Sequence, residues 1–88
     1  MAYRVELTSK AHRELANLPR HAQKRIVRWL DMLAANPRRS KTRQLEGAAE
    51  LRRVHAGKDY VIVYTIRQEQ VLVLVVRIAH RKEVYRNL

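Results

Sequence analysis

The sequence has no cysteine and little glycine, proline or acid: two Gly, two Pro and eight Asp or Glu in 88 residues. Without cysteine, disulfide frameworks and cysteine-ligated zinc modules are excluded, and nothing indicates an oxidising compartment. The longest strongly apolar run, residues 71–76, is far too short for a membrane span. The first six residues contain no apolar signal-peptide segment. We therefore expect a cytoplasmic protein with no membrane partner, and its length predicts one domain over residues 1–88.

Several classes of enzyme site are also missing. His12, His21, His55 and His80 lack the spacing of metal ligands, and no Gly-rich phosphate loop or GxSxG nucleophile motif occurs. The Asp and Glu residues are scattered, whereas a two-metal nuclease needs clustered carboxylates. We expect no metal, no other cofactor and no small-molecule substrate.

Positive charge is abundant. Nineteen Lys and Arg residues against eight acids give a formal net charge of +11, and 47% of the residues are hydrophobic. That hydrophobic content is typical of a packed domain and too high for a disordered basic tail. The charge predicts a polyanionic partner: a nucleic acid, an acidic protein, or both.

The hydrophobic pattern changes from helical spacing to strand-like alternation along the chain. It predicts an α+β fold of order β-α-α-β-β-β, with a helical hairpin packed on a small antiparallel sheet. The expected elements are a strand at 3–7, two helices on either side of Pro19 ending at Asn36-Pro37, a basic connector at 37–49, strands at 50–55, 60–66 and 71–78, and a tail or short helix at 79–88.

Two groups of polar residues are the candidates for a site. The first group comes from the strand before the Ala56–Asp59 turn and that turn itself, and from the last strand and the tail. These residues could converge and support metal-free RNA scission, in which a 2′-hydroxyl attacks the adjacent phosphate and the enzyme handles protons and charge. The group comprises Arg52, Arg53, His55, Lys58, Arg77, His80, Arg81, Lys82 and Tyr85.

The second group could bind an RNA backbone, although such residues can also form an ordinary solvated face. It comprises Arg20, Lys24 and Arg28, one helical turn apart, and the connector residues Arg38, Arg39, Lys41 and Arg43.

Two segments carry a family resemblance. Leu51–Ile66 resembles an Arg-rich strand, a Gly-Asp-Tyr turn and an apolar strand, and Val75–Arg86 resembles the Arg-x-Gly-His-Arg … Val-Tyr-Arg ending of the RelE/ParE toxin superfamily. Leu45-Glu46-Gly47 and the Leu-Pro corner of the helical hairpin also fit. The RelE branch of this superfamily implies a metal-free, ribosome-dependent mRNA endonuclease (mRNA interferase) with a cognate antitoxin, the ribosome and mRNA as partners.

The resemblance also implies residue roles. Arg81 matches the arginine that stabilises the transition state, and Tyr85 matches the tyrosine that contacts or activates the ribose and stacks on the base. Arg53 and His55 match the basic pair before the turn if the turn has one extra residue. Without that extra residue, Arg52 and Val54 take those places.

One residue departs from the RelE pattern. Val61 occupies the position after the turn tyrosine, where RelE members usually have an arginine that grips the scissile phosphate. The departure favours the ParE branch, whose members inhibit DNA gyrase and are not nucleases. A third alternative is an inactive nucleic-acid-binding module that acts only with its antitoxin as a repressor.

Overall fold

The computed structural model describes residues 2–38, 43–44 and 51–86, without the side chains of 43–44 and 84–86. The elements along the chain are β1 Arg4–Leu7, α1 Ser9–Ala16, α2 Arg20–Ala35, β2 Arg43–Gln44, β3 Arg52–Ala56, β4 Tyr60–Arg67, the short 3-10 helix η1 Gln68–Gln70, β5 Leu72–His80 and α3 Arg81–Arg86. None of the helices in the described part is long and apolar enough to cross a membrane.

The strands form one sheet in the order β1-β5-β4-β3-β2. The α+β class and the order of elements are confirmed, but the sheet is mixed because β1 pairs with β5 in parallel. Tight turns force β3, β4 and β5 to run antiparallel, whereas the helical hairpin that follows β1 leaves its direction free. The short strand β2 lies within the expected connector and pairs with the start of β3.

Local signals fix the two long helices. The Thr8 side chain accepts a hydrogen bond from the Ala11 backbone N–H at 3.1 Å and caps α1. Pro19 occupies the N-cap position of α2, where its missing N–H costs nothing. Apolar side chains recur at helical spacing on the face of α2 that is turned toward the sheet. Those of Ala22, Ile26, Leu30 and Leu33 are buried there.

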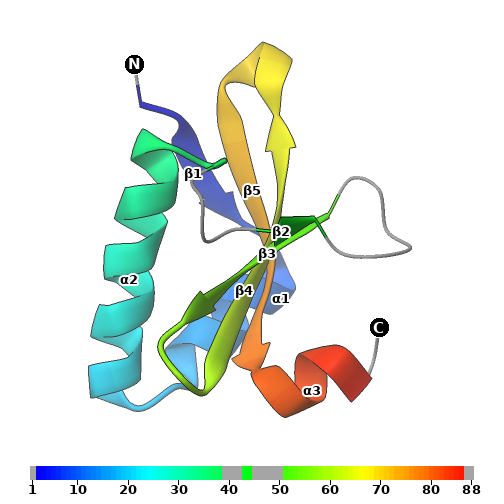
Figure 1. Ribbon diagram of the computed structural model, residues 1–88. Coiled ribbons are helices and arrows are strands. Elements are labelled where there is room, and N and C mark those ends of the chain that lie inside the picture. The colour runs from blue at the N-terminus through cyan, green and yellow to red at the C-terminus, as the bar shows by residue number, and fades with distance from the viewer. Residues whose placement is uncertain (1, 39–42, 45–50, 87–88) are drawn as a thin grey trace.

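The sheet buries residues on both faces. On the helix side, Ile26 and Leu33 pack in one cluster with Ile62 and Ile78 from the sheet. A smaller cluster contains Val61, Val63 and Ala79, which alternate along the strands with the residues of the first cluster. The far face of the sheet is the face that carries this smaller cluster. In Figure 1, α2 covers one side of the sheet and α3 lies on the other, near the end formed by the β3–β4 turn.

Candidate nucleic-acid interface

The far face carries a paired arginine and histidine on β3. Arg53 lies opposite Val63 and His55 lies opposite Val61 in the β3–β4 register, so both side chains share the face of the smaller cluster. Arg53 Nη1 lies 3.1 Å from His55 Nε2. A guanidinium can only donate, so His55 Nε2 accepts, which requires a neutral imidazole with its proton on Nδ1.

The electrostatics of His55 favour the same neutral form. Its ring is partly shielded from water, and this loss of hydration lowers the pKa of His55 below its usual value of 6.5. The positive charges of Arg53 and then Arg81 lower that pKa further. At neutral pH, His55 is therefore a proton acceptor that lies near two guanidinium groups.

Backbone contacts place Arg81 beside this pair. The Arg81 N–H donates to the carbonyl oxygen of Asp59 at 2.8 Å, which joins the first residue of α3 to the β3–β4 turn. The preceding residue, His80, accepts a hydrogen bond at Nδ1 from the Lys82 N–H at 3.2 Å. The first two residues of α3 therefore both have backbone N–H groups held by hydrogen bonds. The Arg81 side chain is exposed.

The floor of this surface is apolar. Val61 is fully buried and Ala79 is 4% exposed, and the two are opposite each other in the β4–β5 register. His55 lies directly across from Val61 on the other side. The residue that departs from the RelE pattern is therefore a core residue at the centre of the site, between its cations.

The alternation of β3 separates Arg53 and His55 from their neighbours in sequence. Arg52 lies opposite Tyr64, which belongs to the helix-side cluster, and Val54 is 1% exposed in that cluster. Of the two alignments that the sequence left open, only the pair Arg53 and His55 lies together on the far face. Arg52 and Val54 share the helix side and form no such pair.

Two further candidates have structural partners. The His80 ring lies opposite Tyr60 in the sheet and meets its ring edge-on at a centroid distance of 6.0 Å. Arg77 forms an ion pair with Glu14, with 2.8 Å between Nη2 and Oε2, and the two side chains are 17% and 19% exposed. The guanidinium of Arg77 is thereby neutralised, and we leave Arg77 out of the RNA contacts proposed below.

Sequence reasoning missed Glu14. Its other oxygen, Oε1, accepts from the Ile78 N–H at 2.9 Å, on a stretch of β5 beyond its pairing with β1. An acid at that place in α1 has no local signature, because its partners lie more than sixty residues later. Its role is to hold the end of β5 from which α3 and Arg81 continue.

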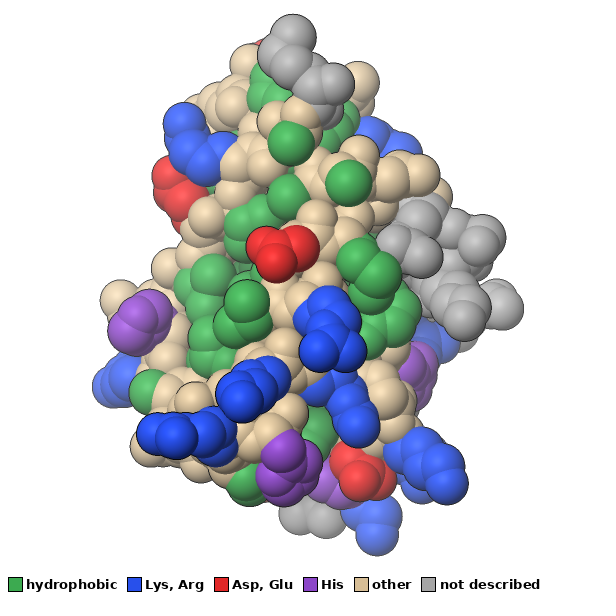
Figure 2. Space-filling view, turned by 90° about the vertical axis from the view of Figure 1, so that its left-hand side faces the viewer, with side chains coloured by type: hydrophobic (Ala, Val, Ile, Leu, Met, Phe, Trp, Pro, Cys, Tyr) green, Lys and Arg blue, Asp and Glu red, His purple; other side chains and the backbone are tan. Residues whose placement is uncertain are grey.

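The remaining predicted cations lie on several different elements. Figure 2 shows Lys and Arg side chains gathered over the lower half of the face that α2 covers. Arg20, Lys24 and Arg28 belong to α2 and are exposed, on the opposite side of the sheet from His55. Arg38 donates to Gln68 Oε1 at 3.0 Å. Lys58 and Lys82 are exposed. Arg39 and Lys41, and the side chains of Arg43 and Tyr85, lie outside the described residues.

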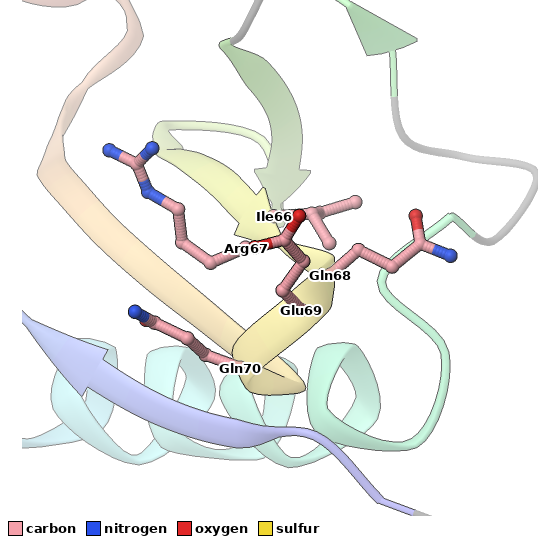
Figure 3. Close-up of a pocket in the computed structure, with 5 residues that line it drawn as sticks. All are labelled: Ile66, Arg67, Gln68, Glu69 and Gln70. Atoms are coloured by element: carbon pink, nitrogen blue, oxygen red, sulfur yellow. The ribbon is translucent and has the colours of Figure 1, made fainter.

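A hollow at the opposite end of the sheet is not a comparable site. It is lined by Ile66, Arg67, Gln68, Glu69 and Gln70. Figure 3 shows that these side chains diverge: Arg67 and Gln70 extend to one side, and Ile66 and Gln68 to the other. No polar groups converge there as they do around His55. The described part of the chain also has no group of three or more His, Asp or Glu residues suited to a metal ion.

Comparison with known proteins gives one family and a consistent fold. The family model described as "ParE toxin of type II toxin-antitoxin system, parDE" matches residues 5–85. The chain is 26% identical to a chain of the toxin–antitoxin complex RelBE2 from Mycobacterium tuberculosis, with a TM-score of 0.82 over 92% of this chain and 100% of that one.

Two other solved structures agree. A chain of the archaeal RelE–RelB complex from Pyrococcus horikoshii is 27% identical, with a TM-score of 0.76 over 92% of this chain and 97% of that one. The isolated RelE toxin of E. coli is 24% identical, with a TM-score of 0.79 over 98% of this chain and 94% of that one, and it shares the fold. No curated protein sequence matches the chain significantly.

Proposed function

The chain belongs to the ParE toxin family of type II toxin–antitoxin systems, within the RelE/ParE superfamily, and we propose that it is a ribosome-dependent mRNA endonuclease. The observation that carries this proposal is the cluster of Arg53, His55 and Arg81. It joins a neutral imidazole to two guanidinium groups on one surface. Such a surface suits metal-free scission of RNA, where the ribosome positions the substrate in its A site.

The proposed reaction is an internal phosphoryl transfer. The ribose 2′-oxygen bonds to the adjacent phosphorus and the bond from phosphorus to the 5′-oxygen breaks, leaving a cyclic phosphate and a free 5′-hydroxyl. One proton leaves the 2′-hydroxyl and one reaches the 5′-oxygen. The enzyme needs a proton acceptor, a proton donor and cations that meet the charge on the phosphorane.

Arg53 and His55 meet the first requirement together. Arg53 now donates to His55 Nε2. A substrate phosphate would draw the guanidinium to itself, because a charged acceptor makes the stronger hydrogen bond. His55 Nε2 is then able to take the proton of the 2′-hydroxyl. The proton that His55 gains would then be available to the departing 5′-oxygen. Arg81 would stabilise the phosphorane, and Tyr85 would contact the ribose or stack on the base.

The cognate antitoxin is the second proposed partner. The toxins in the RelBE2 and RelE–RelB structures are in complexes with antitoxins. A net charge of +11 favours an acidic antitoxin segment, and the ribosome places the activity in the cytoplasm. We expect expression of this chain alone to halt bacterial growth and co-expression of its antitoxin to restore it. Normal growth with folded protein present would contradict a toxin.

One observation favours a second candidate, inhibition of DNA gyrase. Val61 lies buried in the floor of the site, so no guanidinium stands where RelE members usually have one. Without it, the guanidinium groups that the described residues bring to His55 are those of Arg53 and Arg81. In this alternative the protein binds gyrase and cuts no RNA.

A direct experiment separates the two candidates. Purified protein is added to a coupled translation reaction and the 5′ ends of the mRNA are mapped, with a gyrase supercoiling assay alongside. We expect new 5′ ends within translated codons and unchanged supercoiling. Intact mRNA with loss of supercoiling would assign the protein to the gyrase inhibitors. If the protein neither cuts mRNA nor reduces supercoiling, the remaining candidate is a repressor that acts with its antitoxin.

A further inference from the structure

Arg25 differs from the other cations of α2. It follows Lys24 by one residue and therefore lies about 100° around the helix from it. At that angle it reaches the β3–β4 turn. A Cβ atom added to Gly57 would lie 2.6 Å from Arg25 Nη1 and 3.0 Å from its Cδ.

Two features of Gly57 accompany this contact. Its φ of +87° lies in the region that side chains disfavour, and its missing side chain leaves the space that Arg25 occupies. The guanidinium therefore lies directly against the turn. Arg25 is nevertheless exposed, and it forms no ion pair with any carboxylate in the described part of the chain.

The place of Arg25 connects two surfaces that the sheet separates. Arg20, Lys24 and Arg28 lie on the helix layer, whereas His55 and Arg81 belong to the far face. The β3–β4 turn is the end around which one face continues into the other, and Asp59 of this turn binds the start of α3. Figure 2 shows the cations of the α2 face gathered toward this same end of the molecule.

We propose that Arg25 is a phosphate-binding residue that guides an RNA strand around the β3–β4 turn, from the cations of α2 to the site at His55 and Arg81. The inference rests on the proposed ribonuclease function and names a substrate contact that the far-face cluster does not contain. RNA phosphates fit because the guanidinium presents several donors to one anion.

The test compares Arg25→Ala with Arg67→Ala, a matched exposed arginine at the opposite end of β4. Cleavage rates are measured on programmed ribosomes as substrate concentration and salt are varied. For Arg25→Ala we expect KM to rise about tenfold, the change typical of one charged hydrogen bond. We expect kcat to stay within about twofold, because the contact is equal in ground and transition states. The slope of log affinity against log salt should fall by about 1, the release of one counterion. Arg67→Ala should change none of the three.

Two more variants separate charge from placement. Arg25→Lys keeps the charge and loses the planar guanidinium, so we expect an unchanged salt slope with a raised KM. Gly57→Ala keeps Arg25 and displaces its guanidinium, and it should raise KM as well. Thermal unfolding of each variant checks that the fold is kept. If Gly57→Ala unfolds the protein, Arg25→Lys carries the same test.

The outcomes distinguish this inference from the proposed function. If the wild-type protein cuts no mRNA, both fail. If it cuts mRNA and Arg25→Ala behaves like Arg67→Ala, only the role of Arg25 fails. A loss of kcat with unchanged KM would make Arg25 a positioning residue for Arg81, and would overturn phosphate binding.

Discussion

At the scale of single residues, His55 is the group whose protonation the site controls. Its pKa is lowered from 6.5 by loss of hydration and by the charges of Arg53 and Arg81. The neutral form therefore persists to a lower pH than in an unfolded chain. Any stability that this shift confers is fully present above the unfolded pKa and is lost as the pH falls through the folded pKa.

We expect an NMR titration of the His55 ring protons to give a midpoint below 6.5. Arg81→Ala removes one of the cations that disfavour the charged ring, so it should raise the midpoint. Arg67→Ala, at the far end of β4, should leave it unchanged. A midpoint at or above 6.5 in the wild-type protein would contradict the lowered pKa of His55.

Arg81 is the residue whose loss should affect the proposed reaction most. A group that meets the charge of the transition state lowers the barrier selectively. Arg81→Ala should cut the rate of mRNA cleavage by at least about 100-fold, the scale of losing one such donor. Ribosome binding should change little, because Arg81 is one of nineteen Lys and Arg residues.

Tyr85→Phe provides the companion measurement for proton handling. A large loss of rate supports acid–base work by the hydroxyl, and a small loss supports stacking alone. Wild-type cleavage by the double variant of Arg81→Ala and Tyr85→Phe would overturn both assignments.

Val71 holds a backbone conformation that its side chain opposes. It follows η1 with φ 49° and ψ 51°, the left-handed region, and its side chain is 38% exposed. A left-handed residue with a Cβ costs roughly 1–2 kcal/mol, and a branched side chain suits this region poorly.

Val71→Gly should therefore stabilise the fold by about 1 kcal/mol, measured by urea unfolding. Val27, an exposed valine inside α2, is the matched control. Val27→Gly should destabilise by roughly 0.5 kcal/mol through helix propensity. Equal signs for the two substitutions would show that Val71 carries no strain.

At the scale of elements, α1 and β5 are held together by one carboxylate. Glu14 binds the Arg77 guanidinium at 2.8 Å and the Ile78 N–H at 2.9 Å. The N-cap residue Thr8 adds a hydrogen bond from its hydroxyl to the Val76 carbonyl oxygen at 3.0 Å. Beyond the last residue of β1, these side chains take the place of a neighbouring strand along the edge of β5.

We expect Glu14→Ala to lower the free energy of unfolding by about 3 kcal/mol, because it leaves a largely buried guanidinium and a backbone donor without a partner. Glu14→Gln keeps an acceptor for the Ile78 N–H and should cost less. The exposed pair Arg4–Glu6 is the control, and Glu6→Ala should cost well under about 1 kcal/mol. Similar losses of unfolding free energy for Glu14→Ala and Glu6→Ala would contradict the role of Glu14 in holding β5 against α1.

At the scale of the whole molecule, positive charge dominates. The net charge of +11 attracts any polyanion, and Arg20, Lys24 and Arg28 form a predicted stripe of exposed cations on α2. Replacing Arg20, Lys24 and Arg28 together with Ala should reduce the salt slope of ribosome binding by about 3, since each phosphate contact releases about one counterion. A slope unchanged by the triple substitution would make this stripe an ordinary solvated face.

The sequence by itself determined the class of the fold and most of its elements. Helical spacing from Ala22 to Leu33 predicted the buried face of α2, and the turn residues at 56–59 predicted the β3–β4 hairpin. These features depend on side-chain periodicity and turn chemistry within a few residues, which are local properties of the chain. The motifs in Leu51–Ile66 and Val75–Arg86 indicated the toxin superfamily for the same reason, because they are short runs of residues that need no tertiary contact to be recognised.

Only the tertiary structure decided which face of the sheet each residue lies on and which residues from distant elements meet. A shift of one residue on β3 exchanges the two faces, and the pairing with β4 places Arg53 and His55 outside and Val54 inside. The parallel position of β1, the pairing of Arg77 with Glu14 and the approach of Arg25 to Gly57 join residues tens of positions apart. Such contacts leave no periodic trace in the sequence, because they arise when separate elements pack and not from the preference of any one of them.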